Sequence, residues 1–345
     1  MCVTGVSECS QHSLKAKWKE YICFWVGLRY NACPMKTYAK KIIKIATRQS
    51  KLALWQAEFV KSALEAIAPD LTIQLIKIIT QGDQILDAPL AKIGGKGLFV
   101  KELEQVLLEN KADLAVHSMK DVPAELPSGL MLPIILKREN PFDAWVSAYP
   151  FDALPPGSRV GTCSLRRKMQ LKALRQDLEY LDLRGNVDTR LRKLDEGHFD
   201  GIVLAAAGLI RLGCENRMQS VFSEQHILPA VGQGAIGIEC RQEDEATQRL
   251  LAPLACANTT ACVLAERAMN AKLGGSCQIP IAGFAVEAGE SLILEGRVGN
   301  LAGTTLLKTK IKGTFQDPIS LGEAVAQKLC EQGALAIIDE IHQSL

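Results

Sequence analysis

The 345-residue sequence has few aromatic residues, almost no net charge and no long apolar run. Aromatic residues make up 5% of the chain, and the formal net charge is +2. A general nucleic-acid-binding protein usually carries a larger basic excess, so we expect any arginine cluster here to act locally. The longest candidate for a membrane segment, Tyr21 to Leu28, is far too short to cross a bilayer. We therefore expect neither a nucleic-acid nor a membrane partner.

The eleven cysteines show no disulfide or metal-binding pattern. Their number is odd, no C-x-x-C pair occurs, and no spacing matches that of zinc ligands. No secretory signal precedes the first apolar segment. We interpret most of these cysteines as small buried hydrophobic residues in a reducing compartment, the cytoplasm, and we predict no metal site.

The composition is that of a globular protein, with 48% hydrophobic and 23% charged residues. The length exceeds what one hydrophobic core usually supports, which predicts two or three domains. The first 34 residues differ from the rest, because they hold four of the eleven cysteines and two of the four tryptophans without helical or strand periodicity. We predict that residues 1–37 are a disordered leader or a mis-assigned start.

Strand and helix patterns alternate from Ile42 onward. Ile42 to Ala46 is a strand pattern, and Ser50 can cap the helix that follows. Alternating βαβ units predict a mainly parallel sheet with helices on both faces. The predicted buried face of the first helix consists of Leu52, Trp55, Phe59, Val60, Ala63 and Ile67.

The same α/β pattern repeats after a linker near Lys137 to Pro141. In this second half, Ser164 can cap a helix that runs to Leu174, and Asn186 can cap a helix that runs to Glu196. Two similar lobes joined by linkers predict a cleft between them, where small ligands commonly bind. After Asn258, one helix, three alternating strands and two helices predict a separate small α+β domain.

Several charged residues follow predicted strands, where open α/β sheets place functional groups. Asp121 follows the strand Asp113–His117 and is suited to acid/base or cation-stabilising work, although a solvated loop aspartate is an alternative. Guanidinium groups bind carboxylates and phosphates through two hydrogen bonds, so clustered arginines suggest a polyanionic ligand. Surface arginines paired with acidic residues are the alternative. The cluster consists of Arg48, Arg166, Arg167, Arg184, Arg190, Arg192 and Arg211.

Other motifs are weaker. Residues 232–237 match G-x-G-x-x-G, but a strand pattern follows where a dinucleotide site needs a helix, so we predict a hinge or close-approach loop. His117 is interpreted as a core histidine and Cys163 as a packing residue. Cys277 lies between Gly274-Gly275 and Pro280, on an irregular turn where a thiol can be exposed. These residues alone leave a reactive thiol and a plain loop cysteine equally open.

Seven segments, taken together, resemble the porphobilinogen deaminase (hydroxymethylbilane synthase) family. The resemblance runs from about Ile42 to the C-terminus and departs from the family at Cys163, where serine is common. The segments are ATRQSKLALWQA (46–57), PLAKIGGKGLFVKELE (89–104), HSMKDVP (117–123), GTCSLRR (161–167), LRGNVDTRL (183–191), LPAVGQGAIGIEC (228–240) and GGSCQIP (274–280).

The resemblance implies a fold and a domain division. Two doubly wound lobes, similar to periplasmic binding proteins, would enclose a cleft, with a small C-terminal α+β domain beside them. Domain 1 would comprise residues 38–136 plus 235–252, domain 2 residues 138–230, and the C-terminal, cofactor-anchoring domain residues 257–345.

The resemblance also implies the site. Cys277 would hold a dipyrromethane cofactor through a thioether, and Asp121 would be the catalytic group and would also bind the cofactor. Further cofactor-binding residues would be Lys120, Ser164, Arg166, Arg167 and Arg184. Substrate-binding residues would be Arg48, Ser50, Arg190 and Arg211.

The implied reaction is the head-to-tail condensation of four porphobilinogen molecules, each with loss of ammonia, followed by hydrolytic release of a linear tetrapyrrole. That product would pass to uroporphyrinogen III synthase, and the enzyme would be a cytoplasmic monomer. Two other function classes are weighed against this one. A two-lobed anion-binding protein would not explain the GGSCQIP turn or a third domain. An NAD-dependent oxidoreductase would depend on the glycines at 232–237 alone.

Overall fold

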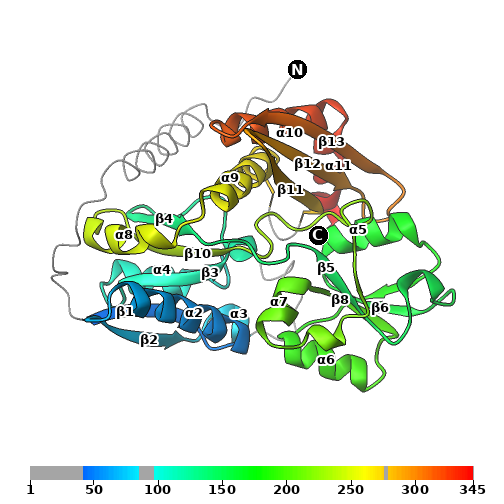
Figure 1. Ribbon diagram of the computed structural model, residues 1–345. Coiled ribbons are helices and arrows are strands. Elements are labelled where there is room, and N and C mark those ends of the chain that lie inside the picture. The colour runs from blue at the N-terminus through cyan, green and yellow to red at the C-terminus, as the bar shows by residue number, and fades with distance from the viewer. Residues whose placement is uncertain (1–41, 85–96, 276–278, 345) are drawn as a thin grey trace.

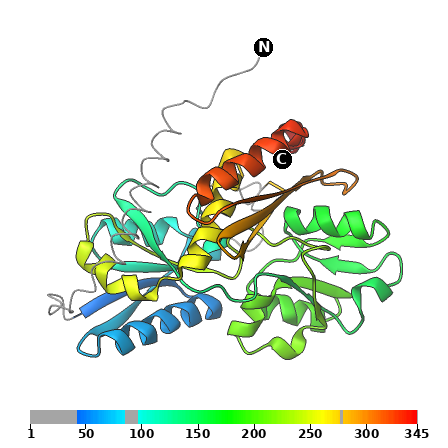
Figure 2. The ribbon, with the colours of Figure 1, turned by 45° about the horizontal axis from the view of Figure 1, so that its top comes forward.

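The computed structural model describes residues 42–84, 97–275 and 279–344, and the predicted leader (residues 1–37) lies outside them. Two α/β lobes lie side by side, and a C-terminal domain lies across both of them (Figures 1 and 2). This arrangement confirms the predicted fold class of two lobes plus a small α+β domain. Among the described residues, no helix is long and apolar enough to cross a membrane.

The first lobe is built on a five-stranded sheet in the order β2-β1-β3-β10-β4. Strands β2, β1 and β3 are parallel, and β10 runs antiparallel to both of its neighbours. Helix α2 packs on one face of this sheet and α4 on the other. The elements are β1 (Ile42–Arg48), α2 (Lys51–Ile67), β2 (Thr72–Ile78), α3 (Gln81–Gln84), α4 (Lys101–Leu108), β3 (Leu114–Ser118), η1 (Met119–Asp121), β4 (Leu130–Ile135), β10 (Ile236–Arg241), α8 (Glu245–Leu251) and η4 (Ala252–Leu254).

The second lobe repeats this design with the order β7-β6-β8-β5-β9. Strands β7, β6 and β8 are parallel, and β5 is antiparallel to β8. The elements are β5 (Asp143–Val146), η2 (Phe151–Ala153), β6 (Arg159–Gly161), α5 (Leu165–Leu174), β7 (Glu179–Leu181), α6 (Val187–Asp195), β8 (Gly201–Ala205), α7 (Ala206–Arg211), η3 (Glu215–Arg217) and β9 (Ser220–Val221). Ser164 and Asn186 cap α5 and α6, as predicted.

The C-terminal domain has a three-stranded antiparallel sheet, and its core is built with its own helices. Its elements are α9 (Ala257–Lys272), β11 (Ile281–Ala288), β12 (Ser291–Gly299), β13 (Leu306–Thr314), α10 (Pro318–Glu331) and α11 (Ala334–Ser344). A smaller cluster (Met169, Leu228, Ala282 and Phe284) joins this domain to the second lobe. The domain is therefore packed onto the lobes and not tethered by chain connections alone.

Both connections between the lobes lead into antiparallel strands. The chain leaves β4 at Ile135 and enters β5 at Asp143, then returns from β9 and enters β10 at Ile236. Periodicity predicted the strand now seen as β10 but not the sheet to which it belongs. Because each crossing segment continues as an interior strand, the relative position of the lobes is set where these two segments touch.

The predicted buried face of α2 is right for Val60 and wrong for Trp55 and Phe59. The helix buries Gln56, Ala57, Val60 and Leu64, whereas Trp55 and Phe59 are 37% and 47% exposed. The Gln56 amide donates to Ser118 Oγ at the end of β3 (2.9 Å), which lets a polar side chain face the sheet. Trp55 and Phe59 instead stack on each other, with ring centroids 5.4 Å apart.

Candidate functional site

The predicted site residues lie just beyond the carboxyl ends of strands in both lobes. β1 ends at Arg48, and the 3₁₀ turn η1, which ends at Asp121, directly follows β3. In the second lobe, Ser164 follows β6 and Arg184 follows β7. In a sheet with the order β2-β1-β3, these ends flank the switch point at which open α/β sheets bind ligands.

The turn that carries Asp121 is fixed by the returning connection. The Met119 amide donates to Ala235 O (3.0 Å), and the Val122 amide donates back to Met119 O (3.3 Å). Gly232 has φ +70°, and a Cβ there would lie 2.8 Å from Met119 Cβ. The glycine-rich segment is thus a close-approach loop, as predicted, and the strand β10 follows it.

Lys120 is solvent exposed, yet protein surrounds it from several directions. Desolvation by these surrounding protein atoms lowers the pKa of Lys120, and the cations Arg167 and Arg190 lower it further. Asp121 and Asp143 act in the opposite direction and raise it. The side chain therefore reaches water at a place where charged groups of both lobes converge.

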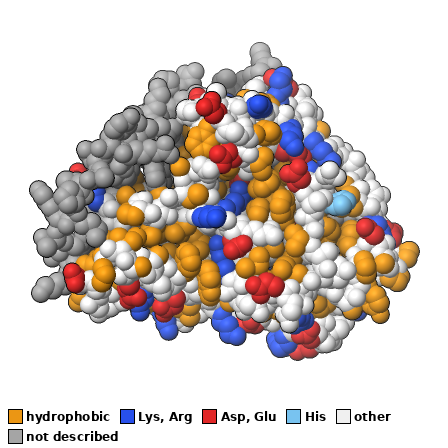
Figure 3. Space-filling model, in the orientation of Figure 1, with side chains coloured by type: hydrophobic (Ala, Val, Ile, Leu, Met, Phe, Trp, Pro, Cys, Tyr) orange, Lys and Arg blue, Asp and Glu red, His pale blue; other side chains and the backbone are white. Residues whose placement is uncertain are grey.

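Arg190 faces the same region from α6. Burial and the neighbouring guanidinium groups of Arg167 and Arg184 lower the pKa of Arg190, whereas Cys163 and Asp121 raise it. Its Nε donates to Gly185 O (2.7 Å) in the loop before α6. Lys and Arg side chains reach the surface at the middle of this face, where the lobes and the C-terminal domain meet (Figure 3).

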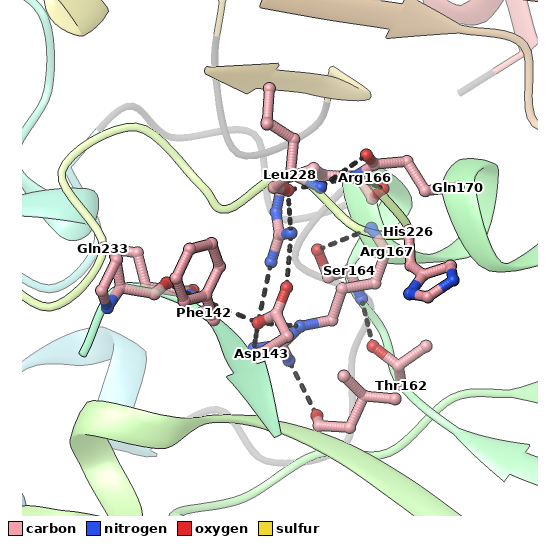
Figure 4. A network of polar contacts seen from close by, with 12 residues as sticks. Phe142, Asp143, Thr162, Ser164, Arg166, Arg167, Gln170, His226, Leu228 and Gln233 are labelled. Atoms are coloured by element: carbon pink, nitrogen blue, oxygen red, sulfur yellow. Dashed lines mark hydrogen bonds and ion pairs between the residues drawn. The ribbon is translucent and has the colours of Figure 1, made fainter. Parts of the chain in front are cut away.

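Arg166 and Arg167 converge on one fully buried carboxylate, that of Asp143 at the start of β5 (Figure 4). Arg166 Nη1 lies 2.6 Å from Asp143 Oδ2, and Arg167 Nη2 lies 2.7 Å from Oδ1. Burial alone would raise the pKa of Asp143, but the two guanidinium groups outweigh it and leave the pKa below its usual range. Gln233 Nε2 also donates to Oδ1 (3.0 Å).

This arrangement gives the two arginines a structural task. Arg166 Nη1 also donates to Leu228 O (2.7 Å), and Arg167 Nη1 donates to Val203 O (2.9 Å). Each guanidinium has five donors, which is more than these contacts to Asp143 and to the two carbonyls use. Binding of cofactor by Arg166 and Arg167 stays a prediction, with their orientation set by Asp143.

Arg48, Ser50 and Ser164 also have partners within the protein. Arg48 pairs with Asp83, and its guanidinium lies 4.3 Å from the centroid of the Phe99 ring. Ser50 Oγ accepts from the Ala53 amide as the N-cap of α2, and Ser164 Oγ accepts from the Arg167 amide (3.4 Å). Both hydroxyl protons can still be donated to a ligand, so these roles stay predictions.

Arg211 joins the lobes. Its Nη2 donates to Gly234 O (2.6 Å) on the returning connection, and its guanidinium lies 5.7 Å from the Trp55 ring of the first lobe. Burial lowers the pKa of Arg211 to about 10, and Glu139 opposes this shift. Here the predicted substrate-binding side chain is part of the contact between the lobes.

Cys277 lies outside the described residues, so its role as an anchor stays a prediction. The described chain approaches it through α9, which ends at Lys272, and through Gly274, which has φ +66°.

Within residues 42–84, 97–275 and 279–344, no group of three or more His, Cys, Asp or Glu side chains could hold a metal ion. His117 is a buried core residue, as predicted, and its Nε2 lies 2.8 Å from Glu239 Oε2.

Two buried carboxylates that organise the site were missed. Asp143 orients the arginine pair, and Glu266 on α9 binds Arg138 (Nη1 to Oε1, 2.6 Å) and the Gly232 amide (2.7 Å). A sequence signal existed for both, because each acidic residue lies within an apolar stretch. Acidic residues are almost never fully buried unless they are paired, so each one should have prompted a search for a cationic partner.

Comparisons with known proteins decide the family. Residues 43–249 match the profile described as porphobilinogen deaminase, dipyromethane cofactor binding domain, and residues 260–331 match the C-terminal domain of that family. A porphobilinogen deaminase from Ruthia magnifica subsp. Calyptogena magnifica is 56% identical over 300 residues, which cover 86% of this chain and 99% of that protein. The chain belongs to the porphobilinogen deaminase family.

Solved structures with similar outlines are more distant. The VFT2 domain of Bordetella pertussis BvgS, as a double mutant, is 15% identical with a TM-score of 0.36, covering 61% of this chain and 85% of that one. A TRAP periplasmic solute-binding protein from Desulfovibrio salexigens is 12% identical with a TM-score of 0.39, covering 63% and 73%. At these scores, neither says anything about ligand or reaction.

The cationic groups between the lobes fit the cofactor of the porphobilinogen deaminase family. A dipyrromethane carries acetate and propionate groups, which are anions at neutral pH. Arg190 lies near enough to Lys120, Arg184 and Asp121 for their charges to interact, and Lys120 interacts with Asp121 as well. Cationic donors around a single carboxylate match a polyanionic chain of pyrroles, whose N–H groups need an acceptor.

Proposed function

We propose that this chain is a porphobilinogen deaminase, a transferase that condenses four porphobilinogen molecules head to tail on a covalent dipyrromethane and releases hydroxymethylbilane by hydrolysis. The observation that supports it best is the position of Asp121. It is a carboxylate at the end of a switch-point strand, electrostatically coupled to Lys120 on its own lobe and to Arg190 on the other.

Asp121 has the chemistry that the condensation requires. Loss of ammonia from an aminomethyl pyrrole leaves positive charge on the pyrrole nitrogen, and carbon–carbon bond formation then releases a proton from the attacked carbon. A carboxylate beside the pyrrole N–H groups stabilises that charge and accepts that proton. Asp121 therefore serves both as the electrostatic partner and as the proton acceptor.

Lys120, Arg184 and Arg190 bind the carboxylates of the pyrrole chain. Charge-assisted hydrogen bonds to carboxylates are roughly twice as strong as neutral ones, and they fix the orientation of each ring. Burial and, after it, the neighbouring cations lower the pKa of Lys120 and of Arg190, and binding of an anion would relieve the repulsion between the cations. Arg166 and Arg167 are oriented for the same task by Asp143, and Arg48, Ser50, Ser164 and Arg211 supply further contacts.

The dipyrromethane is attached through Cys277 and, when bound, supplies the pyrrole carbon to which the first substrate is added. The protein orients that group by its carboxylates and leaves the reacting end next to Asp121. The C-terminal domain, residues 257–345, carries the anchor. Residues 38–136 plus 235–252 and residues 138–230 form the two lobes.

We also propose that the protein acts in the cytoplasm as a monomer and that its product passes to uroporphyrinogen III synthase. The product is a linear tetrapyrrole with a reactive hydroxymethyl group, so an enzyme that closes the ring is its natural consumer. Size-exclusion chromatography with light scattering tests the monomer. A stable dimer would contradict that part of the proposal alone.

A turnover assay tests the proposed function. The purified full chain is incubated with porphobilinogen, and the loss of substrate, the release of ammonia and the formation of tetrapyrrole are measured together. We expect one ammonia for each porphobilinogen consumed and four porphobilinogens for each tetrapyrrole. Tight binding of pyrrole carboxylates without ammonia release would instead identify an anion-binding protein and would contradict the enzyme.

A further inference from the structure

Arg267 on α9 reaches from the C-terminal domain into the first lobe. Its side chain is buried, with 8% of the residue exposed. Its Nη1 donates to Val122 O (3.0 Å), and its Nη2 donates to Pro123 O (2.7 Å) and Ala124 O (3.4 Å). These three carbonyls belong to the residues that directly follow Asp121.

The loop after Asp121 begins at Val122, which packs in an apolar cluster with Met119 and Leu132. Pro123 has no backbone N–H, and the stretch from Pro123 to Ser128 is neither helix nor strand. Buried carbonyls in irregular segments need donors from elsewhere in the protein. The planar fork of a guanidinium can serve several carbonyls with little loss of side-chain freedom, whereas an ammonium binds as a single point.

The neighbouring residue on α9 holds the other side of the same turn. Glu266 Oε2 accepts from the Gly232 amide (2.7 Å), and Gly232 packs directly against Met119 and the Lys120 amide. Two successive residues of one helix thus hold the backbone before and after Asp121. Glu266 acts on the connection between the lobes, whereas Arg267 donates to three carbonyls of the loop that follows Asp121.

We propose that Arg267 is a positioning residue for Asp121: it fixes the loop at Val122 to Ala124 and thereby the carboxylate that takes up the proton. This inference rests on the proposed function. A misplacement of about 1 Å at a reacting group can cost on the order of 100-fold in rate. Loss of the Arg267 guanidinium and its hydrogen bonds therefore acts mainly on kcat. Binding of substrate carboxylates depends on other residues and is retained.

The test compares Arg267→Gln with Arg297→Gln in the full chain. Arg297 is a matched control, because it is also a buried arginine of the C-terminal domain (3% exposed) that donates to loop carbonyls of a lobe. Its Nη2 donates to Glu224 O (2.6 Å) and its Nη1 to His226 O (3.4 Å), in the second lobe. Arg267→Lys and Arg297→Lys form a milder pair that carries the same comparison if the glutamine variants do not fold.

We expect Arg267→Gln to keep its covalent cofactor by intact mass, to lower kcat by about 10- to 100-fold and to change KM by less than about 3-fold. Arg297→Gln, with similar loss of thermal stability, keeps kcat within about 2-fold. Arg267→Lys retains more activity than Arg267→Gln. A double-mutant cycle then asks whether the effect passes through Asp121: in an Asp121→Ala background, Arg267→Gln lowers the residual single-turnover rate by less than about 2-fold.

Equal loss of kcat in the Arg267 and Arg297 variants would overturn the proposal, because it would reveal general destabilisation. If Arg267→Gln lowered the rate by the same factor in the wild-type and in the Asp121→Ala background, the proposal would also be overturned. If the wild-type protein releases no ammonia from porphobilinogen, the proposed function fails first, and the positioning role fails with it. An active wild type with an unimpaired Arg267→Gln variant overturns the positioning role alone.

Discussion

Burial lowers the pKa of Arg190 in the second lobe, and Asp121 of the first lobe opposes that shift, so the two side chains interact electrostatically across the junction between the lobes. Neither lobe alone contains this pair. Lys120, next to Asp121 in sequence, is in turn affected by Arg167 and Arg190. The candidate site is therefore composite, with the proposed proton acceptor Asp121 on one lobe and most of the cations proposed to bind carboxylates on the other.

Replacement of Asp121 should remove turnover without unfolding the protein. Asp121 is a half-buried turn residue, and its backbone is held through Met119 and Val122. We expect Asp121→Ala to lower kcat by roughly 10²- to 10⁴-fold, the usual contribution of a positioned general base, and Asp121→Glu to be less harmful. Steady-state kinetics and circular dichroism of the purified variants check this. Near wild-type turnover in Asp121→Ala would contradict the assignment.

Replacement of Arg190 should weaken binding of the pyrrole carboxylates. We expect Arg190→Leu to lower kcat/KM by about 10- to 100-fold, which corresponds to one lost charge-assisted hydrogen bond, or to leave the cofactor incompletely loaded by intact mass. Arg192→Leu is the control, because Arg192 lies on the same helix, is largely exposed and pairs with Glu196. Equal kinetics in the two variants would show that the carboxylates are bound elsewhere.

Asp143 should be a major source of stability in the second lobe. Asp143→Asn leaves two buried guanidinium groups without their counterion, and loss of one partner from a buried ion pair costs about 3–5 kcal/mol. Asp195→Asn removes an exposed pair with Arg217 and should cost less than about 1 kcal/mol. Urea unfolding followed by tryptophan fluorescence, with Trp145 buried in the same strand, measures both.

The effect of Asp143 should also depend on pH. Its folded pKa lies below the unfolded value, so its stabilisation is complete above the unfolded pKa of about 3.9 and is lost as the pH falls below it. Between pH 5 and pH 3, the wild type should lose about 1 kcal/mol more unfolding free energy than Asp143→Asn. Parallel pH profiles would show that Asp143 is not the group that titrates.

Glu104 should destabilise the first lobe as the pH rises from acidic to neutral. It is 6% exposed on α4, and burial together with the nearby Glu239 raises its pKa to about 7. Because the folded pKa lies above the unfolded value, stability falls as the pH rises from about 4.3 to about 7. Glu104→Gln should therefore gain about 1–3 kcal/mol over the wild type between pH 5 and pH 8. Glu65→Gln, on the exposed face of α2, should show no such gain.

Local features of the fold could be predicted well. The caps Ser164 and Asn186, the parallel strands and the separate C-terminal domain follow from short-range patterns, and all three are present. The α2 face was partly wrong because Gln56 is buried by a hydrogen bond to Ser118, 62 residues away, and because Trp55 lies under Arg211 of the other lobe. Neither contact leaves a periodic signal.

The sequence predicted which residue types form the candidate site, but it did not predict which residues within the protein bind them. Residues at strand ends pointed to Asp121 and the arginines. Their partners come from distant segments: Asp143 lies 23 residues before Arg166, and Glu266 lies 128 residues after Arg138. Such pairs depend on how the two connections between the lobes meet, which no local pattern encodes.

The central claim is that this protein holds a covalent dipyrromethane at Cys277 and extends it next to Asp121. Intact mass spectrometry of the denatured full chain, purified from cells that make porphobilinogen, tests it most directly. We predict that the wild type exceeds its sequence mass by one dipyrromethane, that Cys277→Ser has the bare mass, and that added porphobilinogen shifts only the wild type upward in steps of one pyrrole unit. A wild-type protein with the bare mass, or a Cys277→Ser protein with the added mass, would contradict the account.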